Sequence, residues 1–258
     1  MWAGLGALGD GVAARDDVLQ RYAEPWRHYH ALQHLGECLG ALDATMHLVA
    51  RPAEVEAALW FHDAVYALQR ADNEKQSAQL AQGVLGDAGV ASEVTSWVMD
   101  LILVTRHTAI PQAPDEQLLV DIDLSILGAP VARFAEYERQ IRAEYSFVPQ
   151  ALFAEKRRAI LQSFLARPRL YSTAHFFIAL EAGACQSGWG REWSSVHHIR
   201  RVRRAGWPPL KGVCSGVLSS ARMCLCINGC CARESSGRRL SAHRRTHLQL
   251  ATAPGFGV

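Results

Sequence analysis

The sequence has no apolar run that reaches the ~18 residues needed for a membrane-spanning helix. Its first residues, MWAGLGALGDGVAARDD, are rich in glycine and alanine and do not combine a basic segment with an apolar one, as a secretion signal does. Period-two alternation of apolar and polar residues is also almost absent, which argues against β-strands. We therefore expect a helical, soluble, cytoplasmic protein with no membrane segment.

Cysteine and basic residues are both scarce before Ala184 and frequent after it. Cys38 is the one cysteine of residues 1–184, whereas six of the seven follow Ala184. Residues 185–258 carry 12 Lys and Arg against 2 Asp and Glu, and residues 1–184 carry 15 against 23. This shift predicts two parts, a helical domain over 1–184 and a basic tail over 185–258. In a reducing compartment, Cys38 is expected to pack as a small hydrophobic residue.

Lysine is scarce throughout, with three lysines against 24 arginines, which is typical of a GC-rich gene. The tail mixes Trp, Gly, Ser, Arg and Cys without lasting periodicity, so we interpret it as disordered or as frameshift-derived. One tail pattern favours another reading, because four residues have a spacing that C₂H₂ zinc fingers use. They are Cys226, Cys230, His243 and His247. The aromatic residue that a finger needs after its second cysteine is missing, so we favour chance spacing.

Before Ala184, apolar residues recur at spacings of three and four, which predicts an all-α fold. Pro52 suits the first turn of a helix, and Asp72 and Asn73 suit the residues that start one. A proline-punctuated loop, IPQAPDEQ, separates the first helices from LLVDIDLSILG. The predicted helices run from about 26 to 46, 52 to 68, 74 to 89, 92 to 107, 130 to 145, 149 to 166 and 169 to 183.

Polar residues interrupt two of these apolar patterns. His62 shares a helix face with Val55, Leu59 and Tyr66, so it is expected to be buried and to need a partner for its ring nitrogens. His30 and His34 lie four residues apart and are expected on one face of the helix over 26–46. The pairs His62-Asp63, expected in mid-helix, and Asp121 with Asp123 complete a set of inward-facing metal-ligand types.

Five blocks occur in order at these positions: RHYHALQH, WFHDAVY, DNEKQSA, DIDLSILG and IRAEY. Their order of His, then His-Asp, then Asp on a helical chain resembles the HD superfamily of metal-dependent phosphohydrolases. The likeness covers about residues 22–181 and is closest to a compact subgroup of predicted HD phosphohydrolases. It implies a helical bundle that binds a divalent cation.

The resemblance also implies a set of metal ligands. His34 is favoured as the first ligand, with His30 as the alternative, and His62 and Asp63 would be the adjacent pair. Asp123 would be the last ligand, which leaves Asp121 a supporting or structural role. Two imidazoles and two carboxylates suit Mn²⁺, Fe²⁺, Co²⁺, Zn²⁺ or Mg²⁺.

The implied activity is hydrolysis of a small phosphorylated substrate such as a nucleotide. Asp63 or Glu74 would act as the base, although Glu74 also suits the start of a helix. Four cations could bind phosphate: Arg27, Lys75, Arg106 and Arg142. His107 lies in a segment that resembles a region where some HD proteins have further metal ligands, but we interpret it as a helix-terminal residue. The alternative function is nucleic-acid binding by the basic tail, with the helical part as a sensor or scaffold.

Overall fold

The structure, a computed structural model, describes residues 1–186, with side chains up to Ala184. The predictions for the tail, including those for Cys226, Cys230, His243 and His247, lie outside these residues. The described residues form α-helices and short 3₁₀ helices without a strand, which confirms the predicted all-α class. The elements are η1 (Trp2–Leu5), α1 (Val12–Tyr22), α2 (Leu32–Thr45), η2 (Met46–Leu48), α3 (Pro52–Phe61), α4 (Asn73–Asp87), α5 (Ser92–Val104), α6 (Pro114–Asp123), η3 (Leu124–Gly128), α7 (Val131–Glu144), α8 (Gln150–Leu165) and α9 (Ala174–Gln186).

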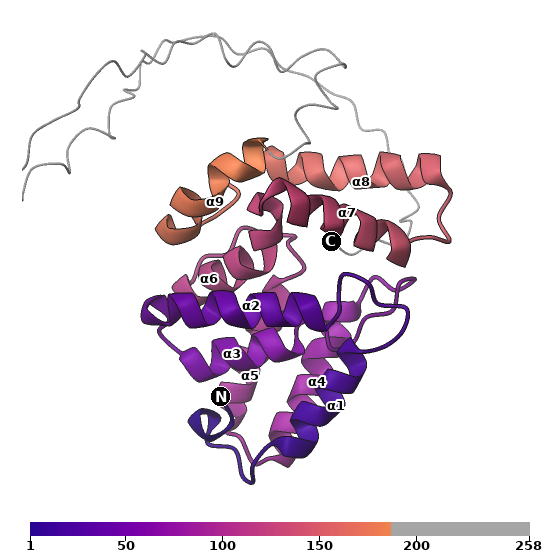
Figure 1. Ribbon diagram of the computed structural model, residues 1–258. Helices are drawn as coiled ribbons and strands as arrows, with labels where there is room; N and C mark the ends of the chain where they lie inside the picture. Colours follow the sequence, from indigo (N-terminus) through magenta and orange to yellow (C-terminus); the bar gives the residue numbers. More distant parts are fainter. Residues whose placement is uncertain (187–258) are drawn as a thin grey trace, which may run out of the picture. The chain divides into compact units, whose positions relative to one another are not determined.

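Helix α3 is deeply buried. Val55, Ala57, Ala58 and Leu59 have no exposed surface, so the helix is apolar on almost every side. It contacts α2, α5 and α6, and α5 in turn lies along α4. In Figure 1, α7 and α8 lie on the side of α2 that faces away from α3. The segments that follow α3 and α6 therefore lie near the middle of the described part.

Three buried carboxylates, here called the anchor carboxylates, each accept hydrogen bonds from backbone N–H groups just before a distant helix. Such bonds satisfy donors that the start of a helix leaves without partners, and they fix where that helix begins. The anchor carboxylates and their donors are Asp115 (Ala50 and Arg51, before α3), Asp121 (Ser172 and Thr173, before α9) and Glu144 (His28, Tyr29 and His30, before α2).

The start of α2 differs from the prediction. The pattern predicted a helix from about Trp26, whereas α2 begins at Leu32. The backbone N–H groups of residues 28–30 bind the Glu144 carboxylate, so they cannot bond to the preceding turn of a helix. The expectation that His30 and His34 lie on one helix face was therefore wrong, because His30 precedes the helix.

The end of α3 also differs, because the helix stops at Phe61 and not near residue 68. His62 is the residue that ends the helix, and Asp63 lies in the following turn, so placing the pair in mid-helix was wrong. Other parts of the chain bind the backbone of this turn: the Tyr22 hydroxyl accepts from the N–H of Asp63, and Ser77 accepts from that of Val65. These tertiary bonds replace those that a longer helix would make.

Helix α9 approaches η3 so closely that two glycines are needed. A Cβ on Gly183 would lie 2.8 Å from the carbonyl oxygen of Gly128, and a Cβ on Gly128 would lie 2.6 Å from the Cβ of Leu180. Any larger residue at either position would push α9 away from η3. The pair therefore sets the distance of α9 from the segment that follows Asp123.

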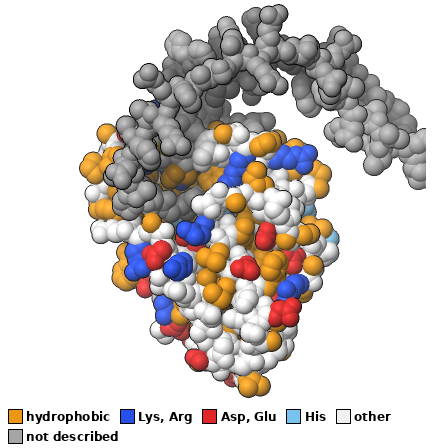
Figure 2. Space-filling view, turned by 180° about the vertical axis from the view of Figure 1, so that it is seen from behind, with side chains coloured by type: hydrophobic (Ala, Val, Ile, Leu, Met, Phe, Trp, Pro, Cys, Tyr) orange, Lys and Arg blue, Asp and Glu red, His pale blue; other side chains and the backbone are white. Residues whose placement is uncertain are grey.

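Figure 2 shows acidic and basic side chains interspersed with small apolar ones on the face opposite to the view of Figure 1. None of the helices within residues 1–186 combines the length and the apolar character of a membrane span.

Candidate metal centre

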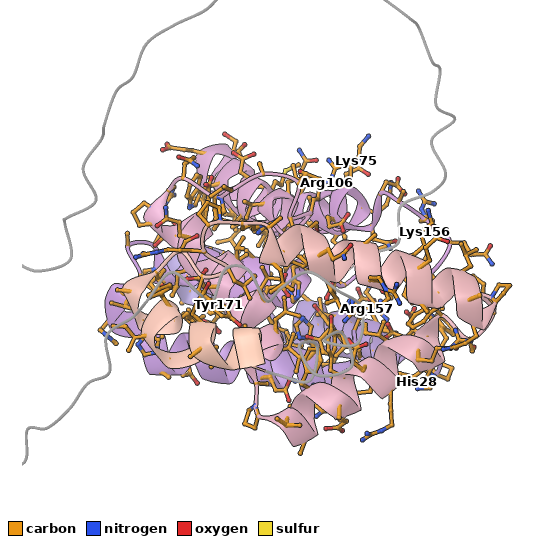
Figure 3. The ribbon with its side chains drawn as sticks, turned by 90° about the horizontal axis from the view of Figure 1, so that it is seen from above. His28, Lys75, Arg106, Lys156, Arg157 and Tyr171 are labelled. Atoms are coloured by element: carbon orange, nitrogen blue, oxygen red, sulfur yellow. The ribbon has the colours of Figure 1, made fainter. Side chains whose placement is uncertain are left out.

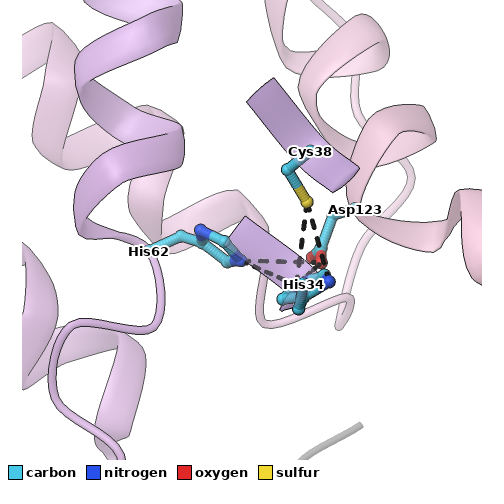
Figure 4. Close-up of side chains that lie close together, drawn as sticks. All are labelled: His34, Cys38, His62 and Asp123. Atoms are coloured by element: carbon cyan, nitrogen blue, oxygen red, sulfur yellow. Dashed lines mark hydrogen bonds and ion pairs between the residues drawn. The ribbon is translucent and has the colours of Figure 1, made fainter. Parts of the chain in front are cut away.

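Four elements bring the predicted ligands to one place. His34 comes from the first turn of α2, His62 from the end of α3, Asp63 from the turn after it and Asp123 from the end of α6. Figure 4 shows the imidazoles of His34 and His62 beside the Asp123 carboxylate. Both histidines are buried, with relative exposures of 2% and 1%. The structure thus brings together two imidazoles and two carboxylates from separate parts of the chain.

The atoms that converge are two ring nitrogens and one oxygen from each carboxylate. His34 Nε2 lies 3.1 Å from His62 Nε2 and 3.2 Å from Asp123 Oδ1. His62 Nε2 lies 3.1 Å from Asp63 Oδ2, and the remaining nitrogen-to-oxygen distances are 3.6 and 3.7 Å. Two ligands that each lie about 2.1 Å from a metal at octahedral to tetrahedral angles are about 3.0–3.4 Å apart. Three of the five distances lie in this range and the other two exceed it by 0.2 and 0.3 Å, so these atoms surround a point that a cation could occupy.

The orientation of His62 is fixed by the helix that precedes it. Its Nδ1–H donates to the carbonyl oxygen of Leu59 over 2.8 Å. This bond leaves the lone pair of the neutral ring on Nε2, the nitrogen that faces His34 and the carboxylates. A hydrogen bond of this kind is the usual support of a metal-binding histidine. The prediction that His62 is buried and needs a partner is confirmed.

Contacts among the residues of the cluster determine which of them are charged. Burial would lower the pKa of His62, but the Asp63 carboxylate, its hydrogen bond and the charge of Asp123 raise that pKa to about 9. Burial would raise the pKa of Asp63, but the charges of His62 and His30 hold it well below its usual range. The two carboxylates are therefore ionised at neutral pH, and a cation that binds Nε2 of His62 must displace the proton of that ring.

His107 supports Asp123 from the other side. Its Nε2–H donates to Asp123 Oδ2 over 3.0 Å, so that carboxylate directs Oδ1 towards His34. His107 has a positive φ of 54°, which is unusual for a residue other than glycine, and Arg167 binds its carbonyl oxygen. Residue 107 does follow the end of a helix, as predicted, but its bond to Asp123 was not foreseen.

Cys38 also lies in the cluster. Its sulfur is 3.7 Å from Nδ1 and 3.8 Å from Nε2 of His34. One ligand atom from each of four residues lies within 4.8 Å of the others: His34, Cys38, His62 and Asp123. Burial, and then the charges of Asp123 and Asp63, raise the pKa of the Cys38 thiol well above its ordinary value. The sequence predicted a packing role for Cys38, although its place one helical turn after His34 could have indicated a shared face.

His30 is held by Glu144 and does not take the place of His34. Its Nδ1–H donates to Glu144 Oε2 over 2.8 Å, and its ring stacks on Tyr66 with centroids 4.0 Å apart. Burial would raise the pKa of Glu144, but the charge and hydrogen bonds of His30 lower it. Glu144 was not singled out from the sequence, because its donors lie more than a hundred residues away.

Arg27 braces the turn that holds Asp63. Its side chain is 1% exposed, and its guanidinium donates to the carbonyl oxygens of His30, Asp63 and Ala64 and to the Glu24 carboxylate. A guanidinium with its donors bound in this way positions the backbone beside the cluster. The predicted role of Arg27 in phosphate binding therefore has no support in these contacts.

The remaining predicted residues lie at varying distances from the cluster. Asp121 binds the N–H groups before α9 and does not reach the imidazoles, in line with the structural role expected for it. Arg142 donates to two backbone carbonyls after α7, over 2.5 and 3.1 Å. Lys75 and Arg106 are exposed, and both project from one edge in Figure 3.

A pocket of about 30 Å³ opens beside the carboxylates of the cluster. Its polar lining is acidic and imidazole-rich, and its apolar lining comes from η3 and aromatic rings. The residues are Tyr29, His30, Asp63, Tyr66, Glu74, Thr105, His107, Asp123, Leu124, Ile126, Leu127 and Tyr137. Burial, with the nearby charge of Asp63, raises the pKa of Glu74. With three carboxylates and no Lys or Arg in its lining, this pocket would repel an anion unless a cation were present.

The donor set therefore fits a divalent cation by its chemistry, its spacing and its orientation. Nitrogen, carboxylate and thiol donors are ligand types of first-row metals, and the soft sulfur of Cys38 suits Zn²⁺, Fe²⁺ or Co²⁺ better than Mg²⁺. Comparisons with protein-family models, with curated proteins and with solved structures found no match to the chain.

Proposed function

We propose that this protein is a metal-dependent phosphohydrolase of the HD type, acting on a small phosphate ester such as a nucleotide. The observation that carries the proposal is the convergence of His34, His62, Asp63 and Asp123 at ligand spacing beside a pocket. The order of these residues along the chain is the order that the HD resemblance implies. A helical fold with these four side chains at one point is consistent with that family.

His34, His62, Asp63 and Asp123 would hold the cation, with Cys38 beside them. When bound, a divalent cation supplies Lewis-acid chemistry, since it withdraws charge from a phosphate oxygen and lowers the pKa of a nearby water. The chain's part is to fix the ligand atoms, and the bonds of His62 to Leu59 and of Asp123 to His107 do so.

Glu74 is the residue that we assign as proton acceptor. Its carboxylate lines the pocket, and its raised pKa makes it a better base than an exposed glutamate. In the proposed step, the oxygen of a water forms a bond to phosphorus while the bond from phosphorus to the ester oxygen breaks. A carboxylate oxygen of Glu74 takes the proton of the water, and the departing oxygen takes a proton from solvent.

Lys75 and Arg106 are the cations that remain for attracting the substrate. Each is exposed and each is next in sequence to a pocket-lining residue, Glu74 or Thr105. Their charges would draw an anion towards the pocket and contribute to phosphate binding outside it. Arg27 and Arg142 are not included, because backbone carbonyls bind their guanidinium groups.

The proposal is tested with the full chain, purified and analysed for metal content and then assayed for phosphate release. We expect release from at least one phosphomonoester or nucleotide in the presence of Mn²⁺, Fe²⁺, Co²⁺, Zn²⁺ or Mg²⁺. Asp63→Asn should lower both bound metal and turnover, the latter at least ~100-fold. Asp100→Asn, at an exposed position of α5, is the matched control and should change neither. Failure of all five metals to support release from any ester would overturn the proposal.

A further inference from the structure

The Tyr29 side chain lies between the cluster and the pocket in a fixed position. It is 4% exposed, and its ring packs against those of His34 and Tyr137 with centroids 4.7 and 4.4 Å apart. Its backbone N–H donates to Glu144, one of the anchor carboxylates, over 2.8 Å. The ring is therefore held from several sides, and its hydroxyl has little freedom to seek a partner elsewhere.

The hydroxyl of Tyr29 has no hydrogen-bond partner among the described residues, although it is buried. A buried hydroxyl without a partner costs stability, and such groups usually have one. Tyr29 lines the same pocket as Asp63 and Asp123. A phenol keeps its proton at neutral pH, so a residue of the pocket lining carries one unused, buried O–H donor.

A second unpaired polar atom belongs to the same pocket. His107 Nδ1 is buried without a partner within residues 1–186, and the His107 side chain is 5% exposed. Because its Nε2–H donates to Asp123, Nδ1 is the acceptor of the neutral ring. Of the four unpaired side-chain atoms in the described part, these two line the pocket, whereas those of Thr95 and Trp97 lie on α5. Two residues of the pocket lining thus carry a donor and an acceptor that have no partner in the described part.

The size of the pocket restricts what can enter. About 30 Å³ is room for about two water-sized groups, at about 10–15 Å³ each. One phosphoryl oxygen and one water fit this space, whereas a sugar or a nucleobase does not. The organic part of a substrate must therefore stay outside.

We infer that Tyr29 is a substrate-binding residue, whose hydroxyl donates a hydrogen bond to a phosphoryl oxygen while His107 Nδ1 accepts one from an adjacent water. This inference rests on the proposed function and adds how the site recognises its substrate. The pocket recognises the phosphoryl group alone, so phosphate esters with differing organic parts share this contact. Discrimination among esters would come from groups outside the pocket, where Lys75 and Arg106 are exposed.

The test is Tyr29→Phe in the full chain, which removes one oxygen atom and keeps the ring. Bound metal should be unchanged, and the affinity of the metal-loaded protein for inorganic phosphate, measured by calorimetry, should fall about 10- to 100-fold, as expected for a hydrogen bond to a charged group. The midpoint of urea unfolding without phosphate should stay the same or rise, because an unpaired buried hydroxyl has been removed. If this hydroxyl had only a structural role, Tyr29→Phe would leave the phosphate affinity unchanged and lower the unfolding midpoint.

Thr95→Val is the matched control, since it also removes an unpaired buried hydroxyl but one that does not line the pocket. Its phosphate affinity should equal that of the unaltered protein. Equal phosphate affinities of Tyr29→Phe and the unaltered protein would overturn the inference, as would a metal-loaded protein that binds no phosphate. If the unaltered protein hydrolyses esters and Tyr29→Phe does so equally well, the proposed function stands and this inference alone fails.

Discussion

Replacement of Glu144 by alanine should destabilise the protein more than most single changes, because one carboxylate holds the segment before α2. Glu144 Oε1 accepts from the N–H groups of residues 28, 29 and 30 over 2.9, 2.8 and 3.0 Å, and Oε2 accepts from His30 Nδ1 over 2.8 Å. The Glu144 side chain has no exposed surface. Truncation therefore leaves the buried N–H groups of residues 29 and 30 and His30 Nδ1–H without their acceptor.

The expected magnitude follows from those donors. A buried group left without its partner costs about 1–3 kcal/mol, and breaking a buried ion pair costs about 3–5 kcal/mol. We expect Glu144→Ala to lower the free energy of unfolding by about 4 kcal/mol. With a urea dependence of about 2 kcal/mol per molar, the unfolding midpoint would fall by about 2 M. Glu144→Gln keeps one acceptor oxygen, so it should lower the free energy of unfolding by only about 1–2 kcal/mol.

The assay is urea unfolding followed by far-ultraviolet circular dichroism, which reports the helices. Glu136→Gln, on the same helix but 41% exposed at its side chain, is the control and should change stability by less than about 0.5 kcal/mol. An unfolding midpoint for Glu144→Ala within 0.3 M of the unaltered protein, taking about 0.1–0.2 M as the error of a midpoint, would refute the assigned role of this carboxylate.

Three further outcomes follow from the described contacts. The pKa of Glu144 is lower in the folded than in the unfolded protein, so the stabilisation by its carboxylate is complete above the unfolded pKa of about 4.3 and is lost as the pH falls through the folded value. Between pH 6 and 3.5, the urea midpoint of Glu144→Gln should therefore fall less steeply than that of the unaltered protein. Asp121→Ala removes the acceptor for the N–H groups of residues 172–173 and should cost about 2–4 kcal/mol in urea unfolding, whereas an unchanged midpoint would contradict the anchoring of α9. Gly183→Ala places a Cβ 2.8 Å from the Gly128 carbonyl oxygen and should lower the thermal midpoint through a loss of about 1–3 kcal/mol, unlike Gly86→Ala, whose Cβ would meet nothing within 4 Å.

The sequence predicted the helical class and the residues of the cluster by two different kinds of signal. Apolar spacing of three and four identified most of the helices and the burial of His62, since periodicity reports which face a helix buries. The ordered blocks predicted, through the resemblance, that His34, Asp63 and Asp123 are neighbours in space, and the structure places them together. Enzymatic activity stays a prediction.

What the sequence could not predict depends on contacts between distant residues. The early end of α3 depends on hydrogen bonds that the backbone N–H groups of the following turn donate to Tyr22 and Ser77, and neither residue leaves a local pattern near residue 61. The late start of α2 depends on Glu144 in the same way. His107 and Cys38 were undervalued because a single histidine or cysteine on an apolar helix is far more often a packing residue than a ligand.

The bond between Glu144 and residues 28–30 has a consequence for how the protein is made. The last metal-ligand candidate, Asp123, is synthesised 21 residues before Glu144, which at about 5–20 residues per second corresponds to about 1–4 s. During that interval a nascent chain carries every ligand of the cluster but lacks the carboxylate that sets the start of α2. If the cluster binds a cation, a purified fragment that ends before α7 should hold it less tightly than a chain that includes Glu144.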